Sequence, residues 1–275
     1  MLSDRQERMD AVKTFSFGKN WQRFLKSLDE DRIRIARESV TEFLGLPDLK
    51  DKTFLDIGCG SGLFSYSAHA LGAQRVVSFD YDLFSVECCR YMHEKAGHPA
   101  NWTIYHGSVL DQAFLNTLGQ FDVVYSWGVL HHTGDMWQAI KNAAGMVKPG
   151  GLFHITIYNA VKRPISAQSW LKIKKLYNRL PKPGKYFLEA VYAVAYILLE
   201  LINLRNPFAQ IRSYKSARGM DWYTDIRDWL GGYPYEFASK DEILQFMQTH
   251  FPGYRLTNLR TTTGSGVNWF LFIRN

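Results

Sequence analysis

The chain has 275 residues, 46% of them hydrophobic, which is enough to bury the core of one large domain or of one domain with an insertion. Its net charge is +7, and no acidic residue occurs between Asp135 and Glu189, a stretch whose lysines and arginines run from Lys141 to Lys185. Such a block indicates either an anionic partner or a solvated helix face.

The cysteines and the N-terminus exclude two further classes. Three cysteines, Cys59, Cys88 and Cys89, are too few for a disulfide framework, so we expect reduced thiols and a cytoplasmic protein. The polar start MLSDRQERMD is not followed by an apolar segment, so no secretory signal is predicted.

The first 50 residues are expected to be helical, with apolar residues partly at helical spacing over 22–44. An aromatic cluster, residues 15–21, precedes this pattern and surrounds Gly18. One interpretation of these rings is a staple that packs the helix against its neighbours.

The stretch TFLDIGCGSG, residues 53–62, predicts a buried strand, a glycine turn and the start of a helix. Gly58, Gly60 and Gly62 allow close approach of the backbone to a ligand, and a helix N-terminus faces the same place. A dinucleotide fingerprint would need a third glycine where Leu63 stands, and the Lys-Ser/Thr of a P-loop is missing.

A second acidic position follows the next predicted strand, residues 74–79. Asp80 lies about 20 residues after the first glycine, the distance expected of a carboxylate that accepts hydrogen bonds from a ribose diol. Tyr81 is placed to pack on the adjoining base, and Asp82 to cap a helix over 83–94.

The pattern D-x-G-x-G-x-G, with Asp56 before Gly58, resembles the first motif of the class I S-adenosylmethionine-dependent methyltransferases. Further features occur in that family's order: strands over 101–106 and 121–126, Gly128 and the pair His131-His132, a helix over 136–147, a Lys-Pro-Gly-Gly turn over 148–151 and a strand over 152–158. Two β-rich runs, 254–262 and 267–273, predict a terminal antiparallel hairpin.

The resemblance implies an α/β fold: a seven-stranded Rossmann-like methyltransferase sheet with a C-terminal antiparallel hairpin, an N-terminal helical lid and an inserted helical cap. The expected division is a lid over 1–50, a cofactor-binding core over 51–159 and 238–275, and a substrate-side cap over 160–237. The lid is a second interpretation of the aromatic cluster.

The implied cofactor is S-adenosylmethionine, which leaves as S-adenosylhomocysteine. The residues expected to contact it are Asp56, Gly58, Cys59, Gly60, Gly62, Asp80, Tyr81, Ser108, Val109, Leu110, Ser126, Trp127 and Trp21. Within the loop after the third strand the assignment stays open, and Asp111 is either an adenine contact or a helix cap.

Residues 160–237 interrupt the α/β alternation beside the carboxyl ends of the strands. The apolar run 186–204 is broken by Glu189 and Glu200, so it is not predicted to span a membrane. We expect a buried helix there; a face on a membrane or the lining of an apolar substrate tunnel is the alternative.

The segment 218–236 resembles uncharacterised bacterial methyltransferases, several of them encoded near genes for glycan assembly. Those relatives often have a histidine where Thr224 stands, so the resemblance does not extend to that position. Expected substrate contacts are Tyr158, Asp225, Asp228, Trp229 and Tyr233; a capped structural corner is the competing interpretation.

A hydroxyl nucleophile must lose a proton, and His131, with His132 close behind, is the expected base. The alternative is a histidine pair that hydrogen-bonds backbone at a helix start. No metal site is expected, because no His, Cys or Asp cluster has ligand spacing.

We therefore expect methyl transfer to a small molecule, a hydroxyl on a lipophilic, anionic or glycan-like acceptor. The motifs of nucleobase amino-methyltransferases and arginine methyltransferases are missing after the fourth strand. The alternatives are an RNA methyltransferase that uses the basic block 141–185, and a non-catalytic S-adenosylmethionine-binding or membrane-associated protein. Peripheral membrane contact is an expected partner interaction; the acceptor atom and the oligomeric state are not predicted.

Overall fold

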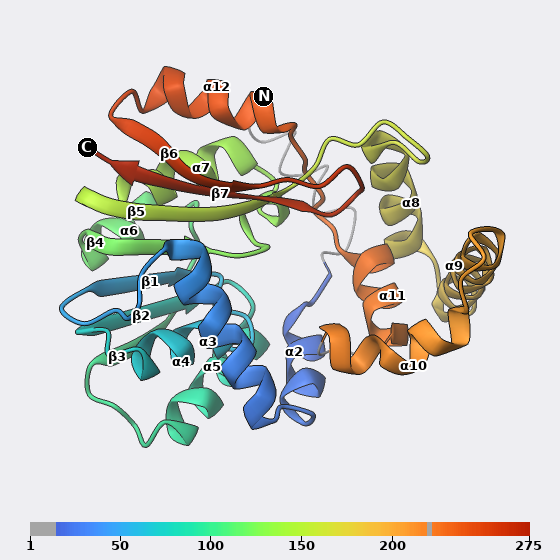
Figure 1. Ribbon diagram of the computed structural model, residues 1–275, viewed down its shortest axis with the longest axis horizontal. Coiled ribbons are helices and arrows are strands. Elements are labelled where there is room, and N and C mark those ends of the chain that lie inside the picture. The colour runs from blue at the N-terminus through green and yellow to red at the C-terminus, as the bar shows by residue number, and fades with distance from the viewer. Residues whose placement is uncertain (1–14, 219–221) are drawn as a thin grey trace.

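A computed structural model describes residues 15–218 and 222–275, and its centre is one seven-stranded sheet (Figure 1). The strands lie in the order β3-β2-β1-β4-β5-β7-β6. Strands β1 to β5 are parallel, and β7 pairs antiparallel with both β5 and β6. The predicted methyltransferase fold, with its terminal hairpin, is confirmed. The strands are β1 (Thr53–Ile57), β2 (Arg75–Asp80), β3 (Trp102–His106), β4 (Phe121–Ser126), β5 (Val147–Tyr158), β6 (Tyr254–Arg260) and β7 (Val267–Arg274).

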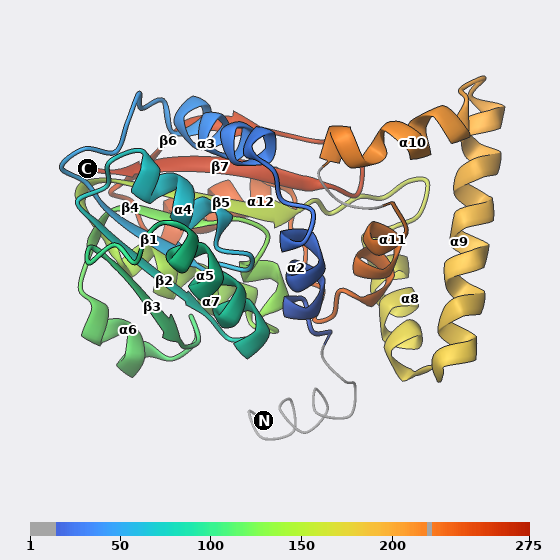
Figure 2. The ribbon, with the colours of Figure 1, turned by 90° about the horizontal axis from the view of Figure 1, so that it is seen from below.

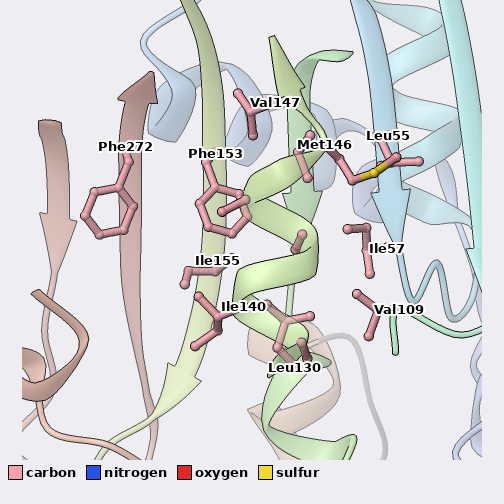
Figure 3. Packing of buried hydrophobic residues seen from close by; sticks show 14 of the residues in the cluster. Leu55, Ile57, Val109, Leu130, Ile140, Met146, Val147, Phe153, Ile155 and Phe272 are labelled. Atoms are coloured by element: carbon pink, nitrogen blue, oxygen red, sulfur yellow. The ribbon is translucent and has the colours of Figure 1, made fainter. Parts of the chain in front are cut away.

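Helices cover both faces of the sheet, because the central strands are apolar on both sides. One face carries α3 (Glu30–Leu44), α4 (Leu63–Ala70) and α5 (Leu83–Lys95), and the other carries α6 (Gln112–Leu118), α7 (Met136–Gly145) and α12 (Lys240–His250). Figure 3 shows the second face, where Ile140 of α7 lies beside Ile155 and Phe153 of β5, and Ile57 of β1 belongs to the same buried cluster. These side chains are fully buried, which fixes the ends of the strands firmly in place.

The N-terminal region differs from the single helical pattern expected over 22–44. Two helices form, α2 (Gly18–Leu25) and α3, and the chain turns between them. Asp29 accepts a hydrogen bond from the backbone N–H of Arg32 at 2.9 Å, so it caps a new helix instead of continuing the first one.

The Lys-Pro-Gly-Gly motif was expected as a turn between a helix and a strand, and this prediction is wrong in detail. Helix α7 ends at Gly145, and β5 already begins at Val147 and includes the motif. The pairing of β4 with β5 shifts register beside it, and Gly150 has φ +75° there. The motif therefore forms a bulge within the strand.

The described part of the insertion, residues 160–218 and 222–237, forms four helices beyond the carboxyl end of β5 (Figures 1 and 2). They are α8 (Ala167–Arg179), α9 (Lys182–Ile202), α10 (Pro207–Arg218) and α11 (Trp222–Gly231). The chain leaves the sheet for the insertion and comes back to it at neighbouring points, because Asn159 forms a parallel bridge with Ala238.

The expectation that the run 186–204 is a buried helix is wrong. Glu189 is the only buried residue of α9, whereas Phe187 is 67% and Ile202 75% exposed. Helix α9 packs on α8, α10 and α11, and it lies at the edge of the molecule farthest from the sheet (Figure 2). Among the described residues, no helix is long and apolar enough to cross a membrane.

The buried His154 of β5 gives a first prediction, which concerns stability. Its Nδ1 lies 3.0 Å from the carbonyl oxygen of Phe270, and the rings of Phe43 and Tyr125 pack on it. Burial lowers the pKa of His154 to about 4. Because the unfolded chain takes up this proton near pH 6.5, acidification from pH 7 to pH 5 should cost about 2 kcal/mol of unfolding free energy.

We expect His154→Leu to remove that loss. Urea unfolding at pH 7 and pH 5 would measure it: the wild type should lose about 2 kcal/mol more than the variant over this interval. An equal loss in both proteins would show that His154 titrates normally in the folded state.

Candidate active site

The three glycines of the loop after β1 all lie in the left-handed region, with φ of +72°, +52° and +79° for Gly58, Gly60 and Gly62. A Cβ at Gly58 would lie 2.4 Å from Val129, and one at Gly62 would lie 2.7 Å from Cys89 Cα. Both conformation and space therefore require glycine here. The loop leads directly into α4, so its backbone N–H groups lie at the N-terminus of that helix.

Asp80, at the end of β2, faces this loop. One carboxylate oxygen accepts the N–H of Gly60 at 3.0 Å and the other accepts the N–H of Asp82 at 2.8 Å. Burial is the main reason that the pKa of Asp80 is raised to about 6. The ionised carboxylate keeps further lone pairs, so it can accept hydrogen bonds from ribose hydroxyls.

Asp56 lies at the same edge of the sheet but points into the core. Its carboxylate accepts the hydroxyl of Ser65 at 2.5 Å, Ser65 accepts from Ser78, and Ser78 accepts the indole N–H of Trp102. Burial raises the pKa of Asp56 to about 7. This chain of hydrogen bonds joins β1, β2, β3 and α4 beneath the glycine loop. Cys59, within the loop, is buried, and its thiol pKa is raised mainly by the neighbouring Cys89.

The residues expected around the adenine fall into two groups. Tyr81 is 76% and Leu110 37% exposed, so both can contact a ligand. Val109 is 4% exposed and packs in the core. Ser108 accepts a hydrogen bond from Leu110, and Asp111 caps α6 through the N–H of Phe114 at 3.0 Å. The cap interpretation of Asp111 therefore describes the structure.

At the end of β4, Ser126 is buried and donates to the carbonyl of Ile57 at 3.2 Å. The ring of Trp127, next in sequence, packs on Phe64 and Trp269. Its Nε1 is buried and has no hydrogen-bond partner among the described residues. Gly128 donates to the hydroxyl of Thr156 at 2.7 Å, which ties this turn to β5.

The histidine pair forms a 3-10 turn, Leu130–His132, next to β5. His131 is fully buried, its Nδ1 lies 3.2 Å from the carbonyl oxygen of Thr156, and burial holds its pKa well below the usual range. His132 pairs through Nδ1 with the carbonyl oxygen of Pro234, and burial lowers its pKa to about 3. A carbonyl only accepts, so each Nδ1 carries the proton and each Nε2 keeps a free lone pair.

A second aromatic cluster, formed by Tyr158, Trp229 and Tyr235, connects the histidine pair to the insertion. The ring of Tyr158 lies 4.1 Å from that of His131, 5.7 Å from Trp229 and 5.0 Å from Tyr235. Three polar atoms of this cluster are buried without a partner among the described residues: Nε2 of His131, Nε1 of Trp229 and the hydroxyl of Tyr235. Buried polar groups are normally hydrogen-bonded, so these three atoms are candidate contacts for a polar ligand.

Lys174 of α8, which no motif pointed to, adds a cation to this cluster. It is fully buried, with Nζ 4.2 Å from the ring centroid of Trp229 and 4.8 Å from that of Tyr235. Nζ donates to the carbonyl of Trp229, and burial lowers the lysine pKa to about 7. Asp228 contributes an attraction, and burial raises the pKa of this carboxyl to about 7.

Residues 15–25, which we call the strap, lie between the glycine loop and the insertion. The indole of Trp21 lies over Gly60, where an added Cβ would come within 2.9 Å of Nε1. Next to it, Asn20 donates to Asp228, and the ring of Phe17 lies 4.7 Å from that of His132. Residues 1–14 of the expected lid lie outside the described residues.

The other expected substrate contacts lie near the strap. Tyr233 is 7% exposed, and its carbonyl accepts the N–H of Phe15 at 3.1 Å. Asp225 lies in the first turn of α11, at whose end Phe15 packs on Gly231. Phe17 and Asn20 belong to the aromatic cluster 15–21, and Lys174 belongs to the basic block, but neither pattern identified their partners, which lie far away along the chain. No pattern in the sequence pointed to Tyr235.

These residues fit S-adenosylmethionine. The glycine loop and Asp80 suit its nucleoside, and Tyr81 and Leu110 present apolar surface beside them. Trp127 supplies an aromatic ring and an unpartnered N–H at the end of β4. No group of three or more His, Cys, Asp or Glu in the described part of the chain is placed to hold a metal ion.

The fold and the site define a class I S-adenosylmethionine-dependent methyltransferase domain. A family model described as a methyltransferase domain matches residues 28–223, and the chain belongs to this family. Membership implies binding of S-adenosylmethionine and S-adenosylhomocysteine.

Among known proteins, the chain is 31% identical over 147 residues to the ubiquinone biosynthesis O-methyltransferase of Methylobacterium nodulans. That match covers 51% of the chain and 57% of the relative, so the chain spans little more than half of the relative's length.

Two solved structures share the fold. Magnesium protoporphyrin IX methyltransferase from Synechocystis, with bound S-adenosylhomocysteine, aligns with a TM-score of 0.51 and 13% identity over 99% of the chain and 94% of that structure. An S-adenosylmethionine-dependent methyltransferase from Mesorhizobium loti aligns with a TM-score of 0.52 and 15% identity over 88% of the chain and all of that structure.

Proposed function

We propose that this protein transfers a methyl group from S-adenosylmethionine to an oxygen atom of a small, lipophilic acceptor that carries an anionic group. The observation that carries this proposal is the set of unpartnered buried polar atoms around Tyr158, next to the histidine pair. The family and the O-methyltransferase relative support the reaction type.

Each group of residues has a proposed task. S-adenosylmethionine, when bound, supplies an electrophilic methyl group on a sulfonium. The glycine loop and Asp80 hold the nucleoside. Trp127 lines the end of β4 with an aromatic face instead of a cation, which suits a positively charged donor. Positioning of the acceptor in line with the methyl group is the main expected source of rate.

The histidines handle the proton. With its Nδ1 proton held by Thr156, His131 presents the lone pair of Nε2 to an acceptor hydroxyl. Burial lowers the pKa of this ring, so the base form is present throughout the neutral range, and the same shift makes His131 a weaker base than an exposed histidine. His132 has the same tautomer and is the second candidate.

Lys174 supports the anionic group of the acceptor. A buried ammonium has three N–H donors, and only the carbonyl of Trp229 accepts from it among the described residues. A carboxylate or phosphate on the acceptor would offset the cost of burying this cation. The rings of Trp229, Tyr235 and Tyr158 supply the apolar surroundings.

The RNA alternative requires the basic block 141–185 to form one surface. Three of its members are dispersed away from such a surface: Lys148 pairs with Asp122 at 2.8 Å near the amino end of β4, Lys174 is buried, and Lys141 packs over Phe246, whereas Lys172, Arg179 and Lys182 stay exposed on the insertion. This dispersion favours a small molecule. The free, buried cysteines are consistent with the cytoplasmic location that we propose.

Isotopically labelled S-adenosylmethionine, incubated with the protein and a fractionated cell extract, tests the reaction. We expect label in an organic-soluble or acidic small-molecule fraction. Label in nuclease-sensitive material would overturn the proposal in favour of RNA. Tight cofactor binding without label in any fraction of extracts from several growth conditions would favour a non-catalytic protein.

A further inference from the structure

The outer face of α9 is a continuous apolar stripe. Exposed side chains recur every three or four residues, which places them on one side of the helix. Phe187 is 67%, Val194 55% and Leu198 53% exposed. The large apolar side chains exposed on or next to this helix are Tyr186, Phe187, Val191, Val194, Leu198, Leu199, Leu201, Ile202, Leu204 and Phe208. They are ten of the twenty exposed large hydrophobic side chains found among the described residues.

The inner side of α9 is held firmly, so this exposure is built into the fold. Glu189 is 2% exposed and accepts the hydroxyl of Tyr177 at 2.6 Å, the hydroxyl of Tyr223 and the guanidinium of Arg227 at 3.2 Å. Tyr192 and Leu188 pack in the same core of the insertion. Rotation of the helix to bury its stripe would expose this paired carboxylate and break three interactions.

The charges between residues 160 and 212, the part of the chain that contains the stripe, are almost all positive. Between residues 160 and 212 the acidic residues are Glu189 and Glu200, and both are paired inside the insertion, Glu200 with Gln210 at 2.7 Å. Exposed cations lie at each end of α9: Lys182 at its start and Arg205 after its end. Lys172 and Arg179 of the adjoining α8 are also exposed.

This combination selects one kind of partner. A second copy of the chain would bring two insertions of the same positive charge together, which is unfavourable. An enclosed substrate tunnel does not fit a face that points away from the sheet and the histidines (Figure 2). An apolar stripe about 30 Å long with flanking aromatic and basic side chains matches a helix that lies in a membrane interface.

We propose that α9 docks the protein on an anionic phospholipid surface, with its stripe in the acyl boundary and the basic residues of the insertion at the headgroups. Apolar burial supplies the attachment, and attraction to the negative leaflet selects the lipid. The stripe of α9 is separate from the pair His131-His132. The inference therefore stands whether or not the acceptor of methyl transfer is a lipid.

Flotation of the full-length protein with vesicles tests this docking. We expect co-flotation with phosphatidylcholine vesicles that contain phosphatidylglycerol, with much weaker binding to phosphatidylcholine alone and at high salt. The variant Val191→Glu/Leu198→Glu places two charges in the stripe. It should bind the anionic vesicles about a hundredfold more weakly, because two buried apolar side chains are lost from the lipid.

A matched control places two glutamates at equally exposed apolar positions elsewhere, Ile35→Glu/Tyr91→Glu, on α3 and α5. This variant should float like the wild type, and all three proteins should keep the same melting temperature. Equal binding of both variants, or no binding of the wild type, would overturn the proposal. A dimer that the α9 substitutions convert to monomer, without vesicle binding, would assign the stripe to a contact between copies. Cofactor binding, measured in parallel, separates failure of this proposal from failure of the methyltransferase assignment.

Discussion

Asp80→Ala is expected to weaken S-adenosylmethionine binding about tenfold to a hundredfold. The carboxylate already accepts two backbone N–H groups, and hydrogen bonds to a charged acceptor contribute about 1.5–3 kcal/mol each. Loss of the bonds to the ribose, together with loosening of Gly60, accounts for the size of the effect. Isothermal titration with S-adenosylhomocysteine would measure it.

The same carboxyl predicts a pH dependence. Because its pKa is raised to about 6, protonation removes a charged acceptor as the pH falls through 6, and cofactor affinity should fall with it. Asp80→Asn should bind weakly at every pH and lose this dependence.

Asp122→Asn is the matched control, since Asp122 pairs with Lys148 near the opposite end of the sheet. It should lower stability by no more than about 1 kcal/mol and leave cofactor affinity unchanged. Unchanged affinity in Asp80→Ala would instead refute the assignment of Asp80 to the ribose.

His131→Ala should lower turnover by about 10²- to 10⁴-fold and leave cofactor affinity nearly intact, because a general base typically contributes that much. His132→Ala should have a smaller effect of the same kind. The measurement is initial rate with saturating cofactor, once the labelling experiment has identified an acceptor fraction.

A buried histidine also packs, so the test needs a variant that keeps the local structure. His131→Asn retains an N–H that can donate to Thr156 but supplies no base, and it should be nearly as slow as His131→Ala. Full activity in both His131 and His132 variants would exclude general-base catalysis by the pair. Full activity in His131→Asn alone would assign His131 a packing role.

Much of the sheet could be predicted because its strands are short apolar runs that end at recognisable residues. Asp80 and Ser126 end β2 and β4, Asp56 lies one residue before the end of β1, and the carboxyl ends of parallel strands meet at one edge. The bulge at Gly150 was not foreseen, since the Lys-Pro-Gly-Gly motif is equally consistent with a turn between elements.

The insertion was less predictable for a physical reason. The spacing of apolar residues identifies an apolar stripe in 186–204, but it does not show whether other parts of the protein or a membrane cover this stripe. The orientation of α9 depends on the pairing of Glu189 with Tyr223 and Arg227, which lie more than thirty residues further along the chain. Lys174 was hidden in the same way, because its aromatic neighbours come from α11 and from the segment that follows it.

The point where the insertion leaves the sheet has a consequence for how such proteins diversify. The backbone N–H of Ala238 donates to Tyr158 at 3.0 Å, and that of Ala160 donates to Ala238 at 3.2 Å, so entry and exit are fastened together. The entropy of closing a loop rises only with the logarithm of its length; shortening about eighty residues to ten would change it by about 2 kcal/mol. The segment between these points is therefore an exchangeable module. Replacement of this segment would change the acceptor and the docking face that we propose, while the glycine loop and Asp80 would stay as they are.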